Sequence, residues 1–140
     1  MKNTYCSRGL HYKTILRSIE NFHKTNTRLA FEDGNVVVSE FLRFMKPDGR
    51  KAYKKFAEGF APMLNTIGGE VVLSVRAEMP IVSEEYWDHF VSFRFPSLKA
   101  MQELYRSDAF QEINVHRIES LDGTLAVVGK PQRMPLKPKD

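Results

Sequence analysis

The stretch EYWDHFVSFRFPS, residues 85–97, decides how the rest of this sequence is interpreted. Strand alternation divides its side chains between two faces: Trp87, His89, Val91, Phe93 and Phe95 on one, and Tyr86, Asp88, Phe90, Ser92 and Arg94 on the other. Both faces are half aromatic, so we expect both faces of the sheet to be covered. Ser97 is then a suitable N-cap for a following helix.

The flanking segments complete the order strand, helix, strand, strand, helix, strand over residues 35–129. The patterns predict strands at 36–44, 70–78, 86–95 and 124–128, and a first helix at 49–66. Pro62 should kink or divide that helix. The second helical region should break or restart at Ser107-Asp108. This order predicts an α+β domain in which a four-stranded sheet carries its helices on one face.

Two segments lie outside this pattern. An apolar stripe over residues 10–24 predicts an amphipathic helix within an N-terminal helical extension, residues 1–34, which we expect to pack on its own domain or on a partner subunit. A role at a membrane surface is the alternative, although few basic residues flank the stripe. The Pro-rich residues 130–140 predict a tail over the surface or onto a neighbouring subunit.

Composition fits one domain, because 140 residues with 42% hydrophobic content can fill a single core. The net charge of +4 resides at the two ends, since residues 35–129 carry eleven Lys and Arg against thirteen Asp and Glu. No recognition motif accompanies the terminal charges, so we expect no nucleic-acid partner. The single Cys6, with no signal-like or membrane-length apolar run, predicts a cytoplasmic protein without a membrane partner.

Short motifs over about residues 35–129 match a known pattern. They are Tyr53 with Phe56, Gly68-Gly69, Trp87-Asp88, Phe93–Ser97, Ala100, Tyr105–Ser107, Phe110-Gln111, Arg117 and Asp122–Leu125. Together they resemble the domain of unknown function thirteen-thirty family, which belongs to the dimeric α+β barrel superfamily with antibiotic-biosynthesis monooxygenases, YCII-like proteins and muconolactone isomerases. The resemblance implies a ferredoxin-like βαββαβ unit whose open sheet face pairs with a second copy in a homodimer. It implies no particular reaction, because the family has none assigned in general.

Charged residues inside predicted strands are the first candidates for a site, because a buried charge needs a partner. They are Arg43, Arg76, Asp88 and Arg94. The expected strand order 4-1-3-2 could bring Arg94 near Arg43, or Asp88 near Arg76. An arginine cluster could hold an anionic or enolate-like ligand. Structural ion pairs at the barrel rim or the dimer seam are the alternative.

Histidine chemistry suggests a second set of candidates. His89 and Trp87 share the face of Phe93 and could line a cleft under the helices, where His89 could act as a base. His116 beside Arg117 is a similar possibility. We predict His89 and Arg94 as catalytic residues. The predicted substrate-binding residues are Tyr53, Trp87, Arg117 and Arg43.

No metal or cofactor is predicted. The four histidines and Cys6 show no ligand spacing, and Gly68-Gly69 follows a helix rather than a strand. Two functions remain open: a cofactor-independent oxygenase or isomerase acting on an aromatic or enolisable compound, and a non-catalytic dimeric module that binds a small ligand or a protein. A closed pocket with a perturbed His or Arg pair favours the first. A pocket filled by Phe41, Phe90 and Phe93 favours the second.

Overall fold

The computed structural model describes residues 34–132. Seven elements follow one another along the chain: β1 (Val36–Phe44), α2 (Gly49–Thr66), β2 (Glu70–Arg76), β3 (His89–Phe95), α3 (Leu98–Arg106), α4 (Asp108–Ser120) and β4 (Leu121–Gly129). The predicted helix at residues 10–24, and the part of the Pro-rich tail beyond residue 132, lie outside the described residues.

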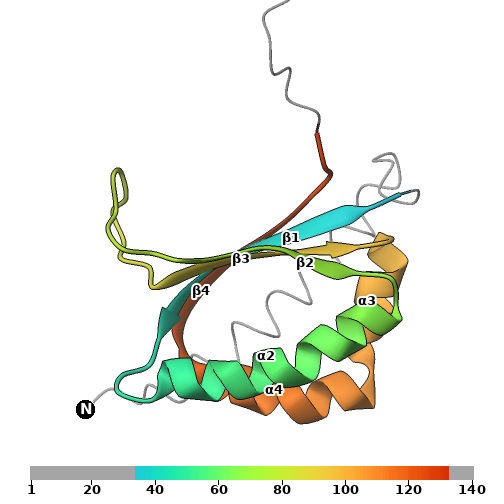
Figure 1. Ribbon diagram of the computed structural model, residues 1–140, viewed down its shortest axis with the longest axis horizontal. Coiled ribbons are helices and arrows are strands. Elements are labelled where there is room, and N and C mark those ends of the chain that lie inside the picture. The colour runs from blue at the N-terminus through green and yellow to red at the C-terminus, as the bar shows by residue number, and fades with distance from the viewer. Residues whose placement is uncertain (1–33, 133–140) are drawn as a thin grey trace, which may run out of the picture.

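The four strands form one antiparallel sheet in the order β2-β3-β1-β4. Helices α2, α3 and α4 all lie on the same side of this sheet, and none of the described elements covers its other side (Figure 1). This arrangement confirms the predicted ferredoxin-like α+β fold, including the strand order. We call the uncovered side the open face.

Alternation along β1 decides which side chains enter the core. Val36, Val38, Leu42 and Phe44 are buried toward the helices, whereas Phe41 on the open face is 38% exposed. The core between sheet and helices is strongly aromatic. Its rings come from α2 (Phe56, Phe60), β3 (Phe93, Phe95) and α4 (Phe110), with Phe60 edge-on to Phe93 at 5.0 Å between centroids.

Serine caps define the second helical region as the sequence predicts. Ser97 Oγ accepts a hydrogen bond from Ala100 N at 3.0 Å at the start of α3. Ser107 separates α3 from α4, and its Oγ accepts from Phe110 N at 3.2 Å. Of the two effects expected at Pro62, a kink or a division, the division does not occur, because α2 continues through Pro62 as one element of 18 residues.

Strand β3 begins later than the alternation suggests. It starts at His89 rather than at Tyr86, and β2 ends at Arg76, so residues 77–88 form a long connection. The predicted face of Trp87 is therefore wrong. Its ring lies 5.9 Å from that of Phe41 on the open face, away from the helix-facing side where Phe93 is buried. The alternation fails here because residues before His89 do not belong to the strand.

Candidate functional site

Phe44, at the end of β1, is the point around which most candidate residues gather. Its ring lies 5.4 Å from that of Tyr53 on α2 and 6.2 Å from that of His89 on β3. The guanidinium carbon of Arg50 lies 4.8 Å from the centroid of the same ring. Three chemically different side chains thus approach one buried aromatic residue from the helix-facing side of the sheet.

A buried ion pair lies deeper in the same layer. Glu40 faces the helices from the middle of β1, and its Oε1 accepts a hydrogen bond from Arg117 Nη2 on α4 at 3.3 Å. Both side chains are only 8% exposed. The other carboxylate oxygen, Oε2, is buried without a hydrogen-bond partner. Two opposite charges in the core fix the register of α4 on the sheet, because either charge without the other would be buried unpaired.

The charges of Glu40 and Arg117 both affect the pKa of Tyr53. Burial raises the pKa of its phenol above the usual value, and the negative charge of Glu40 raises it further. Burial alone would lower the pKa of Arg117, but the charge of Glu40, the neighbouring Tyr53 and Tyr105 and the hydrogen bond to Glu40 together hold the pKa above its usual value. The cluster Tyr53, Glu40 and Arg117 therefore contains a neutral phenol beside a charged pair at neutral pH.

His89 is half-buried at the beginning of β3. Its Nε2 lies 2.8 Å from Ser74 Oγ on β2, whereas Nδ1 is buried without a partner. Burial lowers the pKa of the imidazole, and the positive charge of Arg50 lowers it further. His89 is therefore mainly neutral near pH 7, which is the form that can accept a proton.

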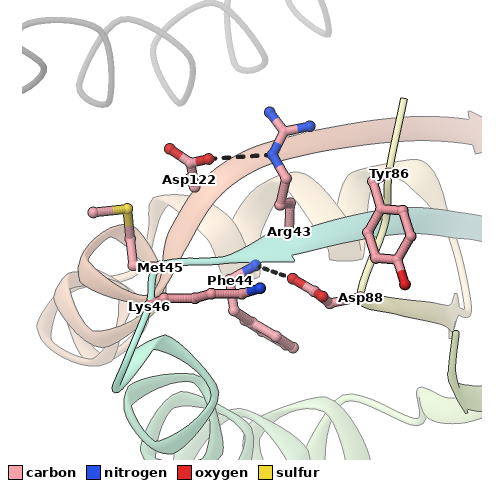
Figure 2. Close-up of a pocket in the computed structure, with 7 residues that line it drawn as sticks. All are labelled: Arg43, Phe44, Met45, Lys46, Tyr86, Asp88 and Asp122. Carbon is pink, nitrogen blue, oxygen red and sulfur yellow. Dashed lines mark hydrogen bonds and ion pairs between the residues drawn. The ribbon is translucent and has the colours of Figure 1, made fainter. Parts of the chain in front are cut away.

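An open pocket of about 390 Å³ lies at the end of the sheet, and we call it the rim pocket. The residues that line it come from the end of β1 and its following loop, from the connection before β3, and from the start of β4: Arg43, Phe44, Met45, Lys46, Tyr86, Asp88 and Asp122. Figure 2 shows Arg43 and Asp122 on one side of β1, with Phe44, Lys46 and Asp88 on the other. The volume lies within the range of pockets that bind small molecules.

Some charged groups of the rim pocket have hydrogen-bond or ion-pair partners among residues 34–132, and Lys46 has no carboxylate partner there. Arg43 Nε donates to Asp122 Oδ2 at 3.2 Å, and Arg43 Nη1 lies 3.6 Å from Glu85 Oε2. Asp88 Oδ2 accepts from the backbone N–H of Phe44 at 2.8 Å. Lys46, by contrast, is exposed and lies within 4 Å of no carboxylate among residues 34–132.

Trp87 and Arg43 are in contact on the open face. The guanidinium carbon of Arg43 lies 5.3 Å from the centroid of the Trp87 ring, which itself packs near Phe41. Gly123 lies opposite Arg43 in the β1–β4 register, where a Cβ atom would approach Arg43 Nη2 to 2.5 Å. The arginine therefore lies between an aromatic ring and a position that only glycine leaves open.

Arg94 lies far from all these groups. It pairs in register with Val37, six residues before Arg43 on β1, which is about 20 Å along a strand. Its guanidinium binds Glu70 Oε1 at 2.9 Å and the carbonyl oxygen of Gly68 at 3.1 Å. The predicted proximity of Arg94 to Arg43 is wrong, because the register separates them.

The predicted pairing of Asp88 with Arg76 is also wrong at the side chains. The two strands do meet there, since Ala77 N donates to the carbonyl of Asp88. Arg76 nevertheless binds Glu78 at 2.7 Å, and Asp88 binds the backbone of Phe44. Local backbone geometry, rather than strand adjacency, decides both partners.

The structure brings four of the six predicted site residues to the Phe44 end of β1: Tyr53 and His89 on the helix-facing side, and Arg43 and Trp87 on the open face. Arg117 reaches the middle of β1 at Glu40, and Arg94 lies apart. Sequence reasoning missed Glu40 and Lys46. Glu40 was detectable, because an acidic residue in the strand VVVSEFLRF, at a position alternating with Val38 and Leu42, must have a buried partner. Lys46 gave no such signal, since exposed lysines in loops are common.

The described residues also bear on metal binding and on membrane crossing. Within residues 34–132, no three His, Cys, Asp or Glu side chains lie close enough together to hold a metal ion. The helices of that same part of the chain are all too short or too polar to cross a bilayer.

The fold and its single antiparallel sheet define a ferredoxin-like α+β protein. The chain belongs to the family described as Domain of unknown function (DUF1330), whose model matches residues 42–131. None of the curated proteins matches it.

Solved structures support the same fold. A protein of unknown function from Rhodopseudomonas palustris, RPA0582, is 24% identical with a TM-score of 0.67, over 74% of this chain and 86% of that one. A DABB family protein with a ferredoxin-like fold from Mesorhizobium loti is 14% identical with a TM-score of 0.53, over 72% of this chain and 100% of that one. A dimeric ferredoxin-like protein of unknown function from Bacteroides fragilis is 11% identical with a TM-score of 0.51, over 71% and 98%.

Proposed function

We propose that this protein is a homodimer that binds a small molecule with an anionic group and an aromatic or otherwise apolar body in the rim pocket. The observation that carries this proposal is the 390 Å³ pocket, where the ammonium group of Lys46 is unpaired among the described residues. The ring of Tyr86 and the side chain of Met45 supply apolar surface beside it. Lys46 would attract the anion, and the apolar surface would hold the body of the ligand.

Aromatic filling of the core supports binding rather than chemistry as the first function. Phe56 and Phe60 stack at 5.2 Å, and Phe110 packs edge-on to both. Phe93 closes the layer from the sheet side. The space between sheet and helices is therefore occupied by side chains in this region, which leaves the rim pocket as the better place for a ligand.

Benzoate is a suitable first probe, because it joins a carboxylate to one aromatic ring. We expect titration of the ¹⁵N-labelled full chain with benzoate to shift the amide signals of Met45, Tyr86 and Asp88 in a saturable way. Signals of α3, for example that of Lys99, should not move. Shifts confined to other regions, or none at millimolar benzoate, would refute binding in the rim pocket.

The open face supports the homodimer. Phe41, Leu73, Val75, Leu125 and Val127 are 38–58% exposed there in a single protomer. The charged groups on the same side are paired, since Arg43 binds Asp122 and Arg94 binds Glu70. An apolar surface of this kind, with its charges neutralised within one copy, fits a second copy of itself about a two-fold axis.

Mass in solution tests the dimer. Light scattering should give about 32 kDa at micromolar concentration, twice the 16.2 kDa of one chain. Val127→Asp, which places a charge on the open face, should give a monomer. Val115→Asp is the matched control, because Val115 on α4 is 48% exposed, close to the 58% of Val127. A monomeric wild type, or an equally tight Val127→Asp dimer, would contradict the proposal.

An enzyme is the second candidate, and His89 favours it. A half-buried, neutral imidazole can act as a base toward an acidic C–H group. Such a reaction is the isomerisation of an enolisable compound without a cofactor. Proton exchange at the methylene of phenylpyruvate in D₂O, followed by NMR, tests this chemistry. The rate should exceed the spontaneous rate and return to it in His89→Gln; an unchanged rate in that folded variant would refute the role of His89.

A further inference from the structure

The loop after β1 and the first two turns of α2 carry an unusual density of positive charge. Five exposed cations lie within ten residues: Lys46, Arg50, Lys51, Lys54 and Lys55. We call these residues the basic cluster. Asp48 is the only acidic residue among residues 46–55.

Most of the basic cluster is uncompensated. Lys54 lies 3.8 Å from Glu58 in an exposed pair one turn along the helix. Within residues 34–132, the other four cations have no carboxylate within ion-pair distance. These cations also lie at or just before the N-terminal end of α2, where the helix dipole disfavours positive charge. The first turn of α2 contains no acidic residue to offset them. A local arrangement that opposes electrostatic preference is a place to expect function.

Two members of the basic cluster adjoin the rim pocket. Lys46 lines it directly. Arg50 lies over the ring of Phe44, which also lines it. Figure 2 shows Lys46 and Phe44 on the same side of β1, opposite Arg43. Among the residues that the structure describes, the pocket therefore has an unpaired ammonium in its lining, an unpaired guanidinium beside Phe44 just outside that lining, and on the other side an arginine engaged by Asp122 and Glu85.

We propose that the ligand of the rim pocket is a small organic phosphate, a phosphate monoester whose phosphate group is bound by Lys46 and Arg50. This inference rests on the proposed function and names its ligand class. A carboxylate carries one negative charge, and one cation suffices to neutralise it. A phosphate monoester carries between one and two charges at neutral pH on three terminal oxygens, so it can engage an ammonium and a guanidinium from two directions. Lys51, Lys54 and Lys55 add to the positive potential that attracts it.

Three probes distinguish this ligand from its alternatives. Phenyl phosphate, benzoate and inorganic phosphate are each titrated into the ¹⁵N-labelled full chain at low salt. We expect phenyl phosphate to bind on the order of tenfold more tightly than benzoate, because it carries the greater charge. Inorganic phosphate should bind more weakly than phenyl phosphate, since it lacks a body to fill the pocket. All affinities should fall as salt is raised to physiological ionic strength.

Substitutions then locate the phosphate. Lys46→Gln and Arg50→Gln should each weaken phenyl phosphate by about fivefold, the effect of one exposed charge pair. Arg50→Gln should weaken the binding of benzoate less than it weakens the binding of phenyl phosphate. Lys99→Gln on α3 is the control, because Lys99 is an exposed cation that does not line the rim pocket. It should leave all three affinities unchanged, and thermal unfolding verifies that each variant is folded.

Each alternative outcome has a separate meaning. If benzoate binds the rim pocket but phenyl phosphate binds no more tightly and ignores both substitutions, the phosphate assignment fails and the proposed function stands. If inorganic phosphate binds as tightly as phenyl phosphate, the site recognises any phosphate and the organic ligand class is wrong. If neither aromatic probe perturbs the pocket, the phosphate assignment and the proposed pocket fail together.

Discussion

Separating the buried charges of Glu40 and Arg117 should destabilise the domain far more than breaking an exposed ion pair would. Arg117→Met leaves the Glu40 carboxylate 8% exposed and without its partner at 3.3 Å. Removing one member of such a pair costs about 3–5 kcal/mol, because the remaining charge stays buried and unpaired. Domains of this size have a total stability of about 5–15 kcal/mol, so the variant should keep a folded state with a much reduced margin.

Urea unfolding, followed by circular dichroism, measures this loss. With a urea slope of about 2 kcal/mol/M, a loss of about 4 kcal/mol lowers the midpoint by about 2 M. Glu40→Leu should cost a similar amount by leaving Arg117 unpaired. The double variant Glu40→Leu/Arg117→Met should recover most of the loss, because the pair can be replaced by apolar side chains of similar volume.

The exposed pair of Arg94 and Glu70 is the matched control for the buried one. Its atoms are closer, at 2.9 Å, but Glu70 is 60% exposed, so Glu70→Gln should cost less than about 1 kcal/mol. Additive effects of the two core substitutions would refute the reasoning, since additivity would mean that the two charges do not depend on each other. A loss for Glu70→Gln equal to that for Arg117→Met would refute it as well.

Three further predictions concern the rim of the site and the helix start. Because the pKa of His89 is lowered on folding, the unfolded state binds more protons below about pH 6.5. The contribution of His89 to stability should thus be complete above that pH and be lost as the pH falls toward the folded pKa. NMR titration should place the midpoint of His89 below that of a model peptide. A midpoint above that of the peptide would contradict burial as the cause. Gly123→Ala should displace the Arg43 guanidinium from Trp87, because the new Cβ would approach Nη2 to 2.5 Å, and unchanged Trp87 side-chain shifts would exclude this. Ser97→Ala should cost about 1 kcal/mol in urea unfolding by removing the cap on Ala100 N, and a cost near zero would mean that water replaces the cap.

The sequence was sufficient for the fold because its local signals are strong and mutually consistent. Alternating apolar residues mark β1 and β3, and Ser97 and Ser107 mark two helix starts that the structure confirms. Trp87 shows where such reasoning ends. Alternation predicts the face of a side chain only within a regular strand, and β3 begins only at His89, after Trp87.

The candidate site was less predictable, because it depends on register and on loop paths. The strand order was correct, yet Arg94 on β3 lies opposite the start of β1 whereas Arg43 lies near the end of β1, since strand order does not specify register. Lys46 enters the rim pocket through the path of residues 45–48, which no periodic pattern describes. Tyr53 and Arg117 were selected by family resemblance. The ion pair of Arg117 with Glu40, and the effect of the Glu40 charge on Tyr53, are what the structure adds.

One strand, β1, connects every feature proposed for this molecule. Glu40 faces the core, Phe41 faces the open side, and Arg43 and Phe44 line the rim pocket from its two sides. Trp87 contacts both Phe41 and Arg43, so a second copy seated on the open face would press on the same ring that supports the pocket arginine. If the dimer forms there, ligand affinity should depend on protein concentration near the dimer dissociation constant, because binding and association share these side chains.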